Sequence, residues 1–186
     1  GANRPTPSTR RVFGGGNPAI QSGPPMEFSI AFSELTSSDM WVNIPYHADS
    51  TYWMAIATLL RDTTTKGQKI YVEFSNEVWN PTFEQYFLCT AERDAVVANA
   101  SGSKIKDDGT TNTLELHARL VAEKTVLIAQ AFEDVFGSGA MMTRIRPVFA
   151  YQIGGAQTYV ENALAFIKVS YGPPSQYIWT ISGAPY

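Results

Sequence analysis

Short apolar segments alternate along the chain with longer segments in which apolar residues recur every three to four positions. The short segments are rich in β-branched and aromatic residues and predict strands, whereas the three-to-four spacing predicts helices with one buried face. The predicted strands are residues 40–44, 69–74, 144–150 and 177–181. The predicted helices are residues 26–35, 50–61, 82–99, 113–136 and 158–169.

This alternation of apolar strands and helices is typical of a parallel α/β fold. Asp49 is the predicted N-cap of the second helix, and Gly137 is the predicted end of the longest one. Residues 1–25 are rich in Gly, Pro, Ser and Asn, which predicts a loop-rich N-terminal segment before one domain of residues 26–186. Periodicity alone leaves open whether the sheet is open and doubly wound or closed into a barrel.

Composition narrows the class of protein. With 44% apolar and 17% charged residues, a chain of 186 residues can bury a sizeable core. The formal net charge is −3 and the pI about 5.4, so no basic field attracts nucleic acid. Charged residues interrupt the longest apolar windows, so we expect no membrane insertion. Cys89 has no His or second Cys at ligand spacing, which favours a buried thiol and predicts neither a metal site nor a cofactor.

The polar residues that could carry chemistry follow the predicted strands. In parallel α/β folds the carboxyl ends of the strands open onto a shared crevice or barrel mouth, so functional side chains gather there. Asn76, Glu77 and Trp79 lie close together after the second predicted strand. An acid partly buried beside aromatic rings has a raised pKa, an amide can bind a ring hydroxyl, and Trp can stack on a pyranose. This combination indicates sugar chemistry.

Three segments carry a resemblance to a known family. Residues 70–80, IYVEFSNEVWN, resemble the fourth-strand motif of clan A glycoside hydrolases, and the chain is similar to secreted glycosidase-like or cellulose-binding barrel proteins that share this motif. Residues 40–49, MWVNIPYHAD, resemble a third-strand exit of those proteins, and residues 181–186, ISGAPY, a sixth-strand exit. The resemblance implies a (β/α)8 TIM barrel in which Glu77 is the general acid/base and Asn76 orients the substrate. It implies a sugar cleft lined by Trp41, His47, Tyr151 and Trp179.

Trp79 could either pack in the core or line this cleft. The resemblance implies a β-linked polysaccharide as the substrate. A retaining glycosidase of this kind needs a second carboxylate about 5 Å from the first. In clan A that nucleophile follows the seventh strand, whereas the chain ends after the strand counted as the sixth. We therefore expect an incomplete barrel, from about strand 2 or 3 to strand 6, which a further protein segment or chain completes. Glu73 is on the same strand face as Glu77, but about 13 Å away in an extended chain.

Several interpretations stay open at this point. Glu77 could instead cap the next helix, and the domain could be a non-catalytic glycan-binding or structural extracellular glycoprotein domain derived from a glycosidase barrel. An open-sheet α/β protein with another small ligand is a third hypothesis. The resemblance implies a secreted protein, and the triplet that begins at Asn99 could then carry a glycan. On the longest helix, Glu115 and Arg119 are predicted to lie on a solvated face.

Overall fold

The fold is α/β and is built around one parallel sheet. The computed structural model describes residues 6–8, 25–99, 103–154 and 157–185. Four strands pair in the order in which they occur along the chain, and every neighbouring pair is parallel. They are β1 (Met40–Ile44), β2 (Ile70–Phe74), β3 (Ile145–Gln152) and β4 (Thr180–Ala184).

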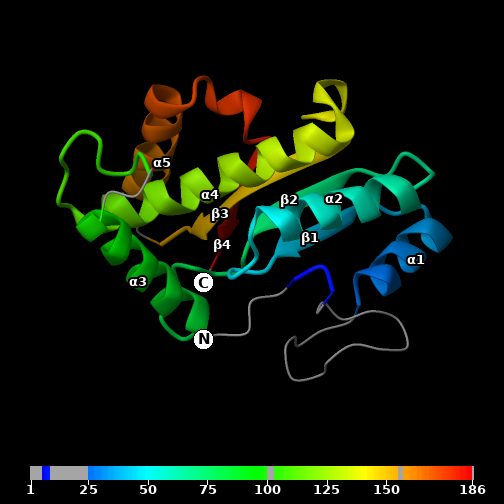
Figure 1. The fold of residues 1–186 in the computed structure, drawn as a ribbon, viewed down its shortest axis with the longest axis horizontal. Helices are drawn as coiled ribbons and strands as arrows, with labels where there is room; N and C mark the ends of the chain where they lie inside the picture. Colours follow the sequence, from blue (N-terminus) through cyan, green and yellow to red (C-terminus); the bar gives the residue numbers. More distant parts are fainter. Residues whose placement is uncertain (1–5, 9–24, 100–102, 155–156, 186) are drawn as a thin grey trace.

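Helices connect the strands, as the alternation in the sequence predicts (Figure 1). The Asp49 carboxylate accepts a hydrogen bond from the Tyr52 amide at 3.1 Å, which confirms the predicted N-cap. Gly137, with φ of 82°, follows the last residue of α4, as predicted. The helices are α1 (Met26–Thr36), α2 (Ser50–Thr63), α3 (Glu84–Asn99), α4 (Thr113–Phe136) and α5 (Gln157–Ser170), with short 3-10 helices η1 (Ser138–Ala140) and η2 (Pro174–Gln176).

The last strand begins three residues later than the sequence predicts. Tyr177 and Ile178 instead close the turn of η2, and their amides donate to the Pro174 carbonyl at 2.9 and 2.8 Å. Ile178 is buried by this turn, so its apolar character reflects core packing rather than a strand. Residues 180–184 then pair with β3, although Ile181 on this outer strand is 40% exposed.

The two faces of the sheet differ in chemistry. Val42, Val72 and Phe149 lie on an apolar face and are at most 3% exposed. Helix α4 contacts β2 and β3 on this side, α2 packs beside it, and both helices cross in front of the sheet in Figure 1. Because successive strand residues point to opposite faces, the register that aligns Trp41 with Tyr71 and Tyr71 with Arg146 puts these side chains together on the other face.

Helix α4 is covered on all sides over residues 116–123. Residues 116–123 are all buried, which leaves no solvent-facing side over about two turns. The prediction that Glu115 and Arg119 lie on a solvated face is therefore wrong for Arg119, which is 9% exposed. The loop of residues 103–112 covers this part of the helix, and sequence periodicity gives no sign of such a covering.

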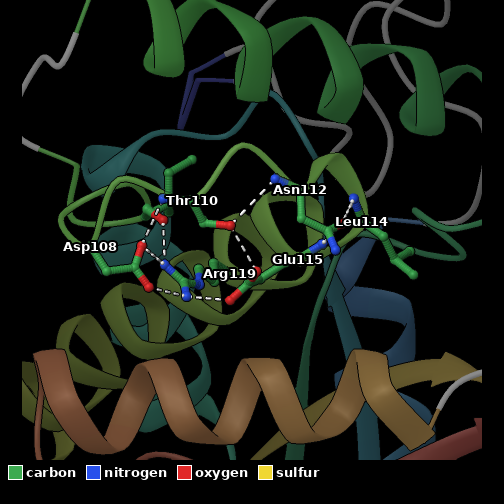
Figure 2. A network of polar contacts seen from close by, with 7 residues as sticks. Asp108, Thr110, Asn112, Leu114, Glu115 and Arg119 are labelled. Carbon is green, nitrogen blue, oxygen red and sulfur yellow. Dashed lines mark hydrogen bonds and ion pairs between the residues drawn. The ribbon is translucent and has the colours of Figure 1, made fainter.

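The Arg119 guanidinium fastens that loop to the helix, as Figure 2 shows. It donates to both carboxylate oxygens of Asp108, at 2.8 and 2.6 Å, and to the Ile105 carbonyl at 2.9 Å. It also contacts the Glu115 carboxylate. Asn112 caps α4 from the end of the same loop, accepting from the amides of Leu114 and Glu115. The planar fork of Arg suits this bidentate arrangement better than the single ammonium of Lys.

We expect Arg119→Lys to lower the free energy of unfolding by about 1–3 kcal/mol, because charge-assisted hydrogen bonds of a buried group are lost while the charge stays. Urea denaturation measures the change. Arg61→Lys is the matched control, since Arg61 forms an exposed pair with Asp62 that contributes less than about 1 kcal/mol. Equal losses in the two variants would contradict the anchoring role of Arg119.

Candidate functional site

The turn after β2 holds the candidate acid in an unusual backbone conformation. Ser75 and Glu77 have φ values of 57° and 47°, in the left-handed region that residues other than glycine rarely adopt. Such a conformation costs on the order of 1–3 kcal/mol per residue and tends to occur at functional positions. The turn places Glu77, half-buried, beyond the carboxyl end of a central strand of the sheet.

Neighbouring side chains stabilise this turn. The side-chain amide of Asn43 on β1 donates to the Ser75 carbonyl at 2.6 Å, and the side-chain amide of Gln85 on α3 donates to the Asn76 carbonyl at 2.7 Å. The Asn80 side chain donates to the Glu77 carboxylate at 2.8 Å. The side chain of Asn76 is exposed. The Glu77 carboxylate, held by the Asn80 side chain, thus belongs to the same strand-end turn as the exposed side chain of Asn76.

Glu73 is a second carboxylate of this region, and sequence reasoning set it aside as too distant from Glu77. It is 7% exposed and accepts a hydrogen bond from the Trp41 indole at 2.8 Å. Burial raises the pKa of Glu73, and the negative charge of Glu77 raises it further, against hydrogen bonds from Trp41 and Asn43 that lower it. The chain turns directly after β2, so the extended-chain separation does not apply and Glu73 senses the charge of Glu77.

Two of the predicted cleft residues, Trp41 and Trp179, come together in an aromatic cluster. Trp41 stacks on Tyr71 with ring centroids 5.7 Å apart, and Trp179 meets Tyr71 edge-on at 5.3 Å. Arg146 lies 4.2 Å above the Trp179 ring and donates to the Tyr71 hydroxyl at 2.7 Å. Tyr71 lies four residues before Ser75, about 13 Å along the strand. This cluster therefore occupies the amino-terminal half of the sheet rather than the end that carries Glu77.

The other predicted site residues lie apart from the aromatic cluster. His47 is half-buried after β1 with its ring edge-on to Tyr46 at 5.6 Å, and Tyr151 of β3 packs against the core. Asn99 is exposed at the end of α3, where its side chain donates to the Ala95 carbonyl at 3.1 Å; residues 100 and 101 of its triplet lie outside the described residues. Trp79 is half-buried and, with residues of α3, α4 and α5, lines a pocket of about 250 Å³.

Cys89 and His117 are both buried, and His117 is one of the residues that line this pocket. Burial raises the pKa of the Cys89 thiol to about 12, which agrees with the predicted inert side chain. Burial lowers the pKa of His117 to about 4, and the positive charge of Arg93 acts in the same direction. His117 is therefore neutral at pH 7. No pattern in the sequence marked His117, because it stands alone on a long helix with no Cys or second His at ligand spacing.

Among the described residues, no group of three or more His, Cys, Asp and Glu side chains could hold a metal ion. None of the described helices is both long and apolar enough to cross a bilayer. Comparisons with protein-family models, with curated proteins and with solved structures returned no match. The likeness to clan A glycoside hydrolases therefore rests on the sequence motifs alone.

We expect Glu73→Gln to raise the stability at pH 7. The pKa of Glu73 is higher in the folded than in the unfolded state, so its protonated form stabilises the fold. This stability is complete below the unfolded-state pKa and is lost as the pH rises through the folded-state pKa. Gln keeps an oxygen that can accept from Trp41 and carries no charge. Urea midpoints at pH 7 and pH 4 should show the advantage of the variant shrinking at the lower pH. The exposed Glu84→Gln is the control, and a less stable Glu73→Gln at pH 7 would contradict the expectation.

His117 should make stability depend on pH in the opposite direction. The unfolded chain takes up a proton near pH 6.5 and the folded chain only near pH 4, so stability is complete above pH 6.5 and falls as pH drops towards 4. Between pH 7 and pH 5 the wild type should lose about 2 kcal/mol more than His117→Gln. Chemical denaturation at the two pH values measures this. His47→Gln retains His117 and serves as the control; the same pH dependence in all three proteins would refute the assignment.

Proposed function

We propose that this chain is a glycoside hydrolase-like domain that acts on a β-linked polysaccharide, with Glu77 as the general acid/base and Asn76 as the residue that orients the sugar. The observation that carries the proposal is the turn after β2. Its strained backbone holds a carboxylate and an exposed amide side by side at the end of a parallel strand, where catalytic groups of α/β folds gather. The sequence motif around it is the one that resembles the glycosidases.

The proposal includes a barrel-derived architecture. Connections between parallel strands are right-handed in nearly all proteins, so a sheet whose strands are added in chain order has its crossover helices on one face. Doubly wound sheets reverse their strand order and carry helices on both faces. The order from β1 to β4 without reversal supports part of a (β/α)8 barrel, about strands 2 or 3 to 6. Glu73 and the aromatic cluster would then face the barrel interior, and a further segment or chain would complete it.

In this mechanism Glu77 protonates the glycosidic oxygen and later removes a proton from water, and the nucleophile is a carboxylate outside this chain. Retaining enzymes hold the two carboxyl groups about 5–5.5 Å apart. We do not assign Glu73 as the nucleophile, because its carboxylate is buried and bonded to the Trp41 indole. Its role in the proposal is to hold Asn43, which donates to the Ser75 carbonyl of the turn. The proposed protein is secreted, and Asn99, being exposed, can carry a glycan.

A non-catalytic glycan-binding or structural extracellular domain is the second candidate. The observation that favours it is the pocket beside Trp79, which offers polar and aromatic groups for a ligand without involving Glu77. The two candidates differ in one requirement. Hydrolysis needs a second carboxylate within reach of Glu77, whereas binding does not.

The test is an assay of hydrolysis on a panel of soluble β-glucans, in which the release of reducing ends is measured. The hydrolase proposal expects activity that Glu77→Gln lowers by at least about a hundredfold, because general acid/base catalysis contributes 10²–10⁴-fold. Glu84→Gln, at the exposed start of α3, is the matched control and should stay active. Activity that survives Glu77→Gln removes Glu77 from the mechanism. Binding of the same glucans without hydrolysis supports the second candidate.

A further inference from the structure

Both outer strands of the sheet have an open edge. Among the described residues, β1 pairs with β2 alone and β4 pairs with β3 alone. The Met40 amide and the Ile44 carbonyl form hydrogen bonds on the side of β2. Alternate residues of a parallel strand bond to opposite neighbours, so the backbone groups of Trp41 and Asn43 point away from β2. An open edge of this kind is a template for pairing with a further strand.

An apolar stripe on α1 borders the open edge of β1. Phe28, Phe32 and Leu35 are each more than half exposed, and their spacing of four and three residues puts them on one side of the helix. A groove of about 290 Å³ separates α1 from the start of β1 and is lined by Phe28, Phe32, Met40 and Trp41, among others. A row of large exposed apolar side chains beside an open strand edge indicates a surface that another protein surface covers.

The other open edge, at β4, exposes apolar side chains on both faces of the sheet. Ile181 is aligned with Phe149 and therefore lies on the face that the helices cover, yet it is 40% exposed. Trp179 directly precedes β4, belongs to the aromatic cluster on the opposite face and is 41% exposed. No residue of β4 is buried. Both edges of the sheet therefore carry apolar groups that a neighbouring strand and helix would cover.

The number, direction and order of the elements fit a second copy of this chain as that neighbour. The four described strands are parallel, and α1, α2, α4 and α5 directly precede β1, β2, β3 and β4. Eight parallel strands that alternate with helices close into a (β/α)8 barrel. A two-fold axis along the strands keeps all of them parallel and places β1 of each copy beside β4 of the other. Both open edges are then closed at once, and no free edge is left.

We propose that two copies of this chain assemble into one closed (β/α)8 barrel, in which β1 of each copy pairs with β4 of the other. The inference rests on the barrel architecture of the proposed function and names the chain that completes it. A helix follows each strand of such a barrel. In the dimer α1 of one copy takes this position after β4 of the other, so its apolar stripe covers the face on which Ile181 is exposed. Trp41 and Trp179 become enclosed in the barrel interior.

The second copy also supplies what the candidate site lacks. The two β2 strands lie on opposite sides of the closed ring, so two Glu77 side chains stand at the same barrel mouth. Catalytic residues of this fold gather at that mouth and come from several different strands. The Glu77 of one copy is thus paired with a carboxylate from outside its own chain, which the hydrolase proposal requires.

The first test is the mass of the protein in solution, measured by sedimentation equilibrium. We expect twice the chain mass of 20.5 kDa. The dissociation constant should be about 1 μM or lower, because well-packed interfaces of standard size reach that range. A protein that remains at 20.5 kDa at about 100 μM overturns the proposal. Open-ended oligomers overturn it as well, because they show that the edges pair without closing the ring.

Two charged substitutions at the open edges test which surfaces pair. Phe32→Glu on α1 and Ile181→Lys on β4 replace exposed side chains, so both variants should fold. Each should weaken dimerisation at least about tenfold, because a charge is buried at the seam. Phe87→Glu on α3 is the matched control, since Phe87 is 59% exposed like Phe32 but lies on a helix that follows the central strand β2. Equal weakening in the Phe32 and Phe87 variants would overturn the proposal.

An equimolar mixture of Phe32→Glu and Ile181→Lys gives a sharper readout. In the mixed dimer one seam joins an unaltered α1 and β1 to an unaltered β4, and the other seam carries two introduced charges of opposite sign. The mixture should therefore dimerise at least about tenfold more tightly than either variant alone. A mixture that dimerises no better than its components contradicts the pairing of β1 with β4.

Glu77→Gln separates this inference from the proposed function. The substitution leaves both seams unchanged, so the variant should dimerise like the wild type. Dimers that hydrolyse none of the β-glucans leave the assembly standing and overturn the hydrolase proposal. A monomer with Glu77-dependent hydrolysis overturns the assembly and leaves the hydrolase proposal standing.

Discussion

The burial of α4 is the constraint on which the rest of the structure depends. This helix contacts β2, β3 and the helices on either side, and residues 116–123 of it have no solvent-facing side. Polar residues within it must therefore be bonded inside the protein or remain unpaired at a cost. Arg119 is bonded to Asp108 and Ile105, and Glu123 accepts from Ser103, Lys104 and Tyr171, so the loop of residues 103–112 is held in place. Of these three, His117 and Arg119 each keep one nitrogen without a partner, Nε2 and Nε respectively.

The polar face of the sheet follows a similar rule. Glu73 is an acid in the middle of a buried strand, and it is tolerated because Trp41 and Asn43 donate to it. Asn43 also holds the Ser75 carbonyl, so the same side chain links the buried acid to the strained turn. The charge of Glu77 raises the cost of ionising Glu73. A buried acid whose pKa is raised lowers stability at neutral pH, and groups of this kind are found more often at functional sites.

The sequence predicted the elements well because periodicity and capping are local properties. The strands β1 and β2, the helix α4 and the caps at Asp49 and Gly137 are where the pattern places them. The sequence pattern places the start of β4 too early. Ile178 is apolar because it lies in a turn that packs into the core, not because it belongs to a strand. The burial of Arg119 depends on a covering loop, and the effect of the Glu77 charge on the pKa of Glu73 depends on a backbone turn. Neither the loop nor the turn leaves a periodic signal in the sequence. No glycine at position 75 or 77 indicates the positive φ of Ser75 and Glu77.

Two unusual features of this molecule, backbone strain and an unpaired buried polar atom, meet at one short segment. Residues 75–80 contain the strained turn, the candidate acid and the indole of Trp79, while Val78 between them is buried in the core. Strain on one side of the segment and unpaired polar atoms on the other both lower stability, and nothing in the packing of α4 requires either of them. A segment fixed by the core through Val78 can present Glu77 towards the strand ends and Trp79 towards the pocket. The same buried anchor therefore positions both Glu77 and Trp79.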